Sequence, residues 1–184
     1  MNDPIERELK ILITKEEYDK IIHSYDFEKQ IKQTNTYYDT PDNQIKKCNG
    51  ALRIRKINHQ NIFTLKIKKD AITHYEYEKQ IDVDTIKEIK DPEILEWCSM
   101  HHISLDVEPI VSFTTYRSVL NLKQAQICAD ITEFDQATDY EIEYEYRYEH
   151  DGISYFNQIL EPIHKQYKKN CPSKIARAFQ YQNL

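Results

Sequence analysis

Apolar and charged residues alternate along IERELKILI, residues 5–13, a pattern typical of a half-buried β-strand. One face of this strand would carry apolar side chains such as Leu9. The other face would carry Glu6, Glu8 and Lys10. Solvent wets the charged face of most alternating strands, so this segment alone is compatible with either a solvated surface or a charged site.

The same kind of pattern predicts eight strands and a few helices along the chain. Runs rich in β-branched and aromatic residues indicate strands, and apolar stripes at helical spacing indicate helices. Strands are expected at residues 5–13, 32–40, 50–57, 61–69, 74–83, 108–120, 125–134 and 139–148. Helices are expected at residues 14–28, at 84–102 with an interruption at Pro92, at 153–167 and at 173–181.

The predicted fold is mainly β, of the α+β class. Most connections between the strands are of hairpin length, which favours antiparallel pairing. Eight strands are enough for a sheet to close around a narrow interior. We therefore expect one domain over residues 1–184, built as an eight-stranded antiparallel closed β-barrel with flanking helices.

Composition excludes several classes of function. The net charge of −6 argues against a general nucleic-acid binder, which needs a basic surface. The four cysteines are far apart and form no CxxC pair, so reduced thiols in a cytoplasmic protein fit best. No signal peptide and no apolar run long enough for a membrane span can be recognised. We expect neither a nucleic-acid nor a membrane partner.

Glycine is rare, with only Gly50 and Gly152 in the whole chain. Walker loops and Rossmann fingerprints need several glycines, because backbone amides must approach the phosphates closely. Any phosphate bound by this protein must therefore be held by side chains.

Charged strand faces of one dominant sign recur along the chain. A basic face is expected on two consecutive strands, with Arg53, Arg55, Lys66 and Lys68, and acidic faces are expected around Glu6 and Glu8, Glu76 and Glu78 beside His74, and Glu141, Glu143 and Glu145. Neighbouring like charges repel each other, so the basic face would be unfavourable without a bound anion. In a closed barrel the first and last strands would adjoin, and the charged faces would line a tunnel with a cationic and an anionic sector.

This charge pattern predicts the class of ligand. Carboxylates at i, i+2 spacing supply the oxygen ligands that Mg²⁺ and Mn²⁺ prefer. Arginine and lysine side chains suit phosphate oxygens. A polyphosphate with a divalent metal would satisfy both sectors.

An ordered set of motifs accompanies these faces and spans about residues 4 to 181. It comprises E-x-E-x-K at Glu6, Glu8 and Lys10, YYDTPD at 37–42, R-x-R at Arg53 and Arg55, K-x-K at Lys66 and Lys68, E-x-E at Glu76 and Glu78, Arg117 in TTYR, Asp130 in CADITEF, and E-x-E at Glu141 and Glu143. The set resembles the CYTH superfamily, also called the triphosphate tunnel metalloenzymes. The chain departs from that pattern at Thr115, where many members have lysine, and at His74, where many have arginine.

The resemblance implies an eight-stranded barrel around a tunnel and hydrolysis of a triphosphate with Mg²⁺ or Mn²⁺. It implies catalytic roles for Glu6, Glu8 and Lys10. Metal ligands would be Glu6, Glu8, Glu76, Glu78, Asp130, Glu141 and Glu143, and phosphate would be bound by Lys10, Arg53, Arg55, Lys66, Lys68, Arg117, Lys174 and Arg177. Lys174 and Arg177 are assigned from their own positions, one turn apart on a predicted helix that could close over a phosphate, and a solvated helix face is an equal alternative. Glu145 continues the acidic face and could be a metal ligand, but it could equally lie in water at the tunnel mouth.

The function expected from these features is hydrolysis of the terminal phosphoanhydride of a small-molecule triphosphate, inorganic triphosphate above all. Three alternatives stay open: a thiamine or nucleoside triphosphatase, an adenylate cyclase of the same superfamily, and a non-catalytic sensor of polyphosphate or nucleotide. The sequence also leaves a homodimer open. Because the metal carboxylates are present, an enzyme is favoured over a sensor.

Overall fold

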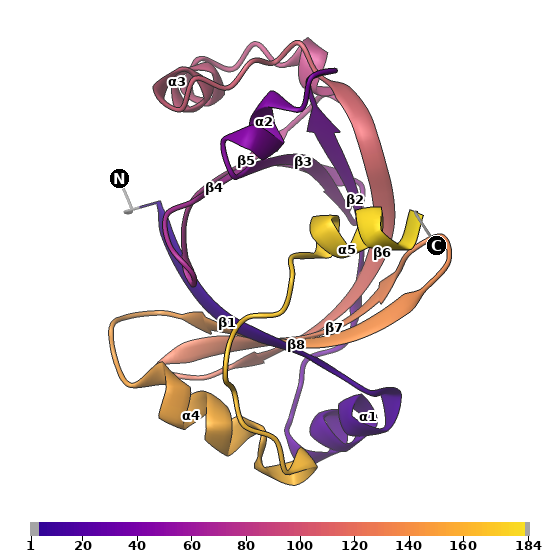
Figure 1. The fold of residues 1–184 in the computed structure, drawn as a ribbon, viewed down its shortest axis with the longest axis vertical. Helices are drawn as coiled ribbons and strands as arrows, with labels where there is room; N and C mark the ends of the chain where they lie inside the picture. Colours follow the sequence, from indigo (N-terminus) through magenta and orange to yellow (C-terminus); the bar gives the residue numbers. More distant parts are fainter. Residues whose placement is uncertain (1–3, 183–184) are drawn as a thin grey trace. The chain divides into compact units, whose positions relative to one another are not determined.

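The computed structural model describes residues 4–182. Its eight strands form a closed antiparallel barrel in the order β1-β5-β4-β3-β2-β6-β7-β8 (Figure 1). The strands are β1 (Ile5–Ile13), β2 (Ile31–Asp39), β3 (Gly50–Ile57), β4 (Gln60–Lys68), β5 (Thr73–Ile81), β6 (Glu108–Asn121), β7 (Ala125–Glu133) and β8 (Thr138–Tyr146). The predicted barrel is confirmed, and every strand begins within one residue of its predicted start.

The helices differ more from the prediction. The described residues form α1 (Lys15–Ser24), α2 (Gln44–Lys47), α3 (Pro92–Met100), α4 (Gly152–Ile159) and α5 (Lys174–Gln182), with 3₁₀ turns η1 (Ile86–Glu88) and η2 (Glu161–Ile163). The segment 84–102 is interrupted at Pro92 as predicted, and it forms the 3₁₀ turn η1 followed by α3, because Pro92 suits only the first turn of a helix. No helix among the described residues is long and apolar enough to cross a membrane.

The chain divides into two compact units, which are described separately. One comprises residues 4–5 and Gln33–Phe113 and is called the central unit. The other comprises Glu6–Lys32 and residues 114–182 and is called the terminal unit.

In the central unit, strands β3 and β4 present one apolar and one charged face. The apolar side chains Leu52 and Phe63 are fully buried in the core. Helix α3 contributes Ile94 to that core, and its Trp97 ring stacks on Phe63 with 6.5 Å between ring centroids. Since side chains alternate along a strand, this packing directs the basic residues of β3 and β4 to the opposite face.

In the terminal unit, β1 and β8 are adjacent, as the acidic faces predict. Leu9 pairs with Tyr144, and Ile11 pairs with Ile142 in antiparallel register. Both α1 and α4 pack on β8 (Figure 1), and the α4 residue Phe156 lies against the Tyr144 ring. This apolar layer directs the charged residues of both strands to the other face of the sheet.

Asp39, the last residue of β2, fixes the turn into α2. Its buried carboxylate accepts hydrogen bonds from the backbone N–H groups of Thr40 at 2.8 Å, Ile45 at 2.9 Å and Lys46 at 3.0 Å. The short helix in turn places the Ile45 side chain in the core of the central unit. One carboxylate therefore connects the end of a strand to a core residue.

We predict that Asp39→Ala lowers the free energy of unfolding by about 2–4 kcal/mol, because the substitution leaves buried backbone donors without an acceptor. Urea unfolding followed by circular dichroism measures the loss. The matched control is Asp42→Ala, which removes an exposed carboxylate from the same turn and should cost less than about 1 kcal/mol. Equal losses in the two variants would show that α2 does not depend on Asp39.

Candidate functional site

Each unit carries one cluster of charged side chains on the sheet face opposite its apolar core. The Arg53 cluster of the central unit consists of Arg53, Arg55, Lys66, Glu76 and Glu78. The Glu143 cluster of the terminal unit consists of Arg117, Asp130, Glu141, Glu143, Lys174 and Arg177. Together these clusters contain most of the site residues that the sequence predicts.

The Arg53 cluster spans β3, β4 and β5. The pairing of β4 with β5 sets Lys66 opposite Glu76, so their side chains lie on the same face. Arg53 Nη2 lies 3.6 Å from Glu76 Oε1 and 3.5 Å from Glu78 Oε1. Lys66 Nζ lies 3.6 Å from the other Glu76 oxygen. The basic and acidic residues thus form one mixed cluster.

The sequence predicts separate cationic and anionic sectors, and this mixture of basic and acidic side chains corrects that prediction. The basic face does not depend on a bound anion for compensation, because Glu76 and Glu78 on the adjacent strand supply negative charge. Burial lowers the pKa of Arg53, but Tyr37 and the two glutamates outweigh burial, so the net pKa is raised. Burial and the nearby Glu76 raise the pKa of Glu78.

The ion pairs of Arg53 and Arg55 with the two glutamates are long, although Thr64 of β4 donates a 2.8 Å hydrogen bond to Glu78. The ion-pair distances of 3.5–3.9 Å in the Arg53 cluster are longer than those of hydrogen-bonded pairs. Arg53 Nε is buried and has no hydrogen-bond partner among the described residues. A buried N–H without an acceptor is costly, so the cluster retains donor capacity for an anionic ligand. Lys68, at the end of β4, is exposed.

The Glu143 cluster contains three buried carboxylates from two adjacent strands. Asp130 of β7 lies directly opposite Glu141 of β8, and the side chain of Glu143 follows on the same face. These side chains are almost inaccessible, with exposed fractions of 0%, 1% and 5% for Asp130, Glu141 and Glu143. One carboxylate oxygen from each lies within 4.8 Å of the others.

Cations from β6 and α5 neutralise these carboxylates. Lys174 Nζ lies 2.9 Å from Asp130 Oδ2 and 2.7 Å from Glu143 Oε1, and it also donates a hydrogen bond to Glu141. Arg117 donates two hydrogen bonds to Asp130, at 2.8 and 2.7 Å, and another to Glu143. Every carboxylate of the cluster therefore contacts a cation whose side chain is at most 14% exposed.

Arg177 holds α5 against β8. Its side chain is 1% exposed, and its Nε donates to Asp139 Oδ2 at 2.7 Å. Its Nη1 donates to the Pro172 carbonyl oxygen at 2.6 Å and forms an ion pair with Glu141. The alternative of a solvated helix face is wrong for both Lys174 and Arg177, because their side chains are only 12% and 1% exposed and form ion pairs with the carboxylates of the sheet.

The pKa values of the two glutamates of β8 are shifted in opposite directions. Burial and the neighbouring Glu143 raise the pKa of Glu141, although Lys174 and Arg177 oppose the rise. Burial would also raise the pKa of Glu143, but Lys174 and Arg117 outweigh it and hold this pKa well below its usual range. Glu143 is therefore the firmly ionised member of the pair.

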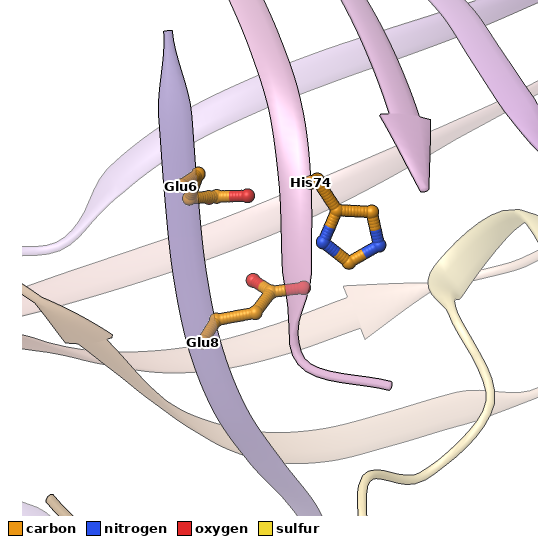
Figure 2. A group of neighbouring side chains, drawn as sticks. All are labelled: Glu6, Glu8 and His74. Atoms are coloured by element: carbon orange, nitrogen blue, oxygen red, sulfur yellow. The ribbon is translucent and has the colours of Figure 1, made fainter. Parts of the chain in front are cut away.

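Strand β1 adds a further charged pair to the terminal unit. Lys10 pairs with Glu143 in the register of β1 and β8, and Glu8 pairs with Glu145. The Glu8 side chain is buried, and Lys10 Nζ donates to its Oε1 at 2.6 Å. Figure 2 shows Glu6 and Glu8 on the same side of β1; the third labelled residue, His74, belongs to β5 of the central unit.

The donor set of the Glu143 cluster fits a divalent cation. Three convergent carboxylates supply hard oxygen ligands, which are the ligands that Mg²⁺ and Mn²⁺ take in proteins. The predicted ligands Asp130, Glu141 and Glu143 are thus brought together. Glu76 and Glu78 instead pair with arginine in the Arg53 cluster.

Two residues that the sequence did not single out support the cluster. Asp139 accepts hydrogen bonds from Arg177 and, at 2.8 Å, from the Tyr181 hydroxyl. Asn170 accepts from the backbone N–H of Lys10 at 2.8 Å and donates to the Glu8 carbonyl at 3.0 Å. Asp139 could have been found by extending the i, i+2 spacing of the acidic face by one step, whereas Asn170 leaves no periodic signal.

The geometry and the motifs are those of a known family. Residues 4–179 match the CYTH domain, and the chain belongs to this family. It is 28% identical to the Bacillus subtilis protein named "Putative triphosphatase YjbK", over 98% of this chain and 97% of that protein.

Solved structures show the same fold. A Bacillus halodurans protein described as a "putative adenylate cyclase" superposes with a TM-score of 0.82 at 27% identity, over 95% of this chain and 97% of that chain. A Hippeastrum protein, described as a putative adenylyl cyclase with a dominant triphosphatase activity, superposes with a TM-score of 0.75 at 20% identity, over 96% and 95% of the two chains.

We predict that Glu143→Gln lowers the free energy of unfolding by about 3 kcal/mol near neutral pH, because it breaks buried ion pairs with Lys174 and Arg117. The pKa of Glu143 is lower in the folded than in the unfolded protein, so the ionised form stabilises the fold. This stabilisation is complete above the unfolded pKa of about 4.3 and is lost as the pH falls toward the folded pKa. The difference between wild type and variant should therefore shrink in acid.

Urea unfolding at a series of pH values measures this difference. The control is Glu145→Gln, two residues further along β8, whose partly exposed carboxylate lies 3.5 Å from Arg117. We expect the control to lose less than about 1 kcal/mol at any pH. If the loss of unfolding free energy in Glu143→Gln were the same at neutral and acid pH, Glu143 would not be the ionised carboxylate that stabilises the fold.

Proposed function

We propose that the protein is a divalent-metal-dependent triphosphatase that hydrolyses the terminal phosphoanhydride of inorganic triphosphate. The observation that carries the proposal is the convergence of Asp130, Glu141 and Glu143 in a CYTH-family chain that is similar to the protein named "Putative triphosphatase YjbK". The Arg53 cluster, in which Arg53 Nε has no hydrogen-bond partner among the described residues, adds donors of the kind that bind phosphate oxygens.

In this proposal the carboxylates bind metal and the basic side chains bind phosphate. The metal ligands are Asp130, Glu141 and Glu143, joined by Glu6 and Glu8 of β1. The phosphate ligands are Lys10, Arg53, Arg55, Lys66, Arg117 and Lys174, with Lys68 at the exposed end of β4. Arg177 positions α5 through its contacts with Asp139 and Glu141, and its buried Nη2, which has no hydrogen-bond partner among the described residues, is a further donor for phosphate.

Bound Mg²⁺ or Mn²⁺ would neutralise phosphate oxygens and make a nearby water more acidic. Side chains of the protein stabilise the developing charge and accept the proton. Arginine and lysine stabilise the charge that develops on the transferring and leaving phosphates. A carboxylate of the site accepts the proton of the attacking water. No covalent nucleophile is required.

A nucleotide cyclase is the second candidate, because the Bacillus halodurans relative carries that description. Such an enzyme would release pyrophosphate and cyclic AMP from ATP, whereas a triphosphatase releases inorganic phosphate. Assays on one protein preparation with tripolyphosphate, ATP and thiamine triphosphate separate these functions. Phosphate release that is fastest from tripolyphosphate, and that stops in EDTA, supports the proposal.

Among variants, we predict that Arg53→Met lowers kcat/KM for tripolyphosphate by about a hundredfold or more, because it removes a preorganised cation from the reacting phosphates. The control is Lys79→Met, which removes a β5 lysine paired at the surface with Asp91 and Glu93. The control should keep wild-type kinetics, and melting curves should show both variants folded. Equal kinetics in the two variants would show that Arg53 does not bind the reacting phosphates. If the wild-type protein turned over no triphosphate, a binding protein would be favoured over an enzyme.

A further inference from the structure

Lys174 occupies the position in the Glu143 cluster that a metal ion would need. Its ammonium group contacts Asp130, Glu141 and Glu143 at once, and its side chain is only 12% exposed. These are the same three carboxylates whose oxygens converge closely enough to bind a cation. One set of convergent oxygens cannot hold an ammonium and a divalent ion at the same point.

The helix that carries Lys174 is fixed by contacts outside the three carboxylates. Asp139 accepts hydrogen bonds from Arg177 and Tyr181, which lie one turn and two turns after Lys174 on α5. Just before the helix, the Asn170 side chain bonds the backbone of β1, and the Cys171 N–H donates to the Lys10 carbonyl at 3.2 Å. The ammonium is therefore held in the cluster by an anchor at each end of the segment.

We propose that Lys174 is an internal counter-cation that competes with the divalent metal for Asp130, Glu141 and Glu143. Its ammonium group leaves these carboxylates when triphosphate binds. The inference rests on the proposed function and adds a regulatory step to it. A buried ammonium that loses its carboxylates needs another anion, because an unpaired buried charge is strongly destabilising. A triphosphate brings that anion, and its oxygens accept the hydrogen bonds that Lys174 releases.

The exchange makes metal and triphosphate bind cooperatively. Metal alone must displace Lys174 without compensation, so its affinity for the free protein is reduced. Metal with triphosphate gives Lys174 a new partner, so each ligand raises the affinity for the other by the same factor. The protein would thus load metal together with its substrate rather than before it.

The test is calorimetric titration of Mn²⁺ into phosphate-free protein. Lys174→Met should bind Mn²⁺ about tenfold or more tightly than wild type, because no ammonium competes for the carboxylates. Lys174→Arg keeps the charge and should stay within about threefold of wild type. The control Lys165→Met removes a lysine that pairs with Glu17 outside the cluster and should leave Mn²⁺ affinity unchanged.

A second variant tests the competition without changing the cluster itself. Asp139→Asn weakens the anchor of α5, so amide exchange in α5 should become faster and Mn²⁺ affinity should rise, by less than in Lys174→Met. If Lys174→Met does not fold without metal, Asp139→Asn still tests whether Lys174 competes with Mn²⁺ for the carboxylates.

Unchanged or weaker Mn²⁺ binding in folded Lys174→Met would overturn the inference. Faster α5 exchange in Asp139→Asn with unchanged Mn²⁺ affinity would also overturn it. Neither result depends on turnover, so a triphosphatase without this exchange is distinguishable from a protein that binds Mn²⁺ at the cluster but hydrolyses no triphosphate.

Discussion

A carboxylate removed from water stays ionised only when cations or hydrogen-bond donors lie beside it, and the charged faces of this protein depend on that constraint. Asp130, Glu141 and Glu143 are almost completely buried, so each needs a partner. Arg117 and Lys174 supply those partners. The compensation comes from side chains of β6 and α5, while the carboxylates belong to β7 and β8.

Strand periodicity explains how charges reach these positions. On β3, β4, β1 and β8, packing of the apolar residues against helices or neighbouring strands leaves every second residue on the opposite face. Antiparallel register then brings charges from different strands together, as with Lys66 and Glu76 or Lys10 and Glu143. The hydrophobic core thereby sets the geometry of the charged clusters.

The same reasoning separates what the sequence predicts from what it does not. Alternation is a local signal, so the strands follow from it. The closed barrel and the pairing of β1 with β8 follow from the number of strands, the hairpin-length connections and the acidic faces of the first and last strands. Partner choice across strands is not local, which is why the placement of Glu76 and Glu78 beside Arg53 was not predicted. The anchoring roles of Asp139 and Asn170 depend on where the C-terminal segment lies, and α2 is too short to show helical periodicity.

The central claim is that the buried carboxylates bind a metal ion that acts together with a triphosphate held by the basic side chains. Anomalous diffraction from crystals grown with Mn²⁺ and tripolyphosphate measures this directly. The account predicts a manganese peak at about 2.1 Å from carboxylate oxygens of the Glu143 cluster, with Lys174 Nζ moved onto a phosphate oxygen. A manganese peak confined to exposed carboxylates, with Lys174 still bound to Asp130, Glu141 and Glu143, would contradict it.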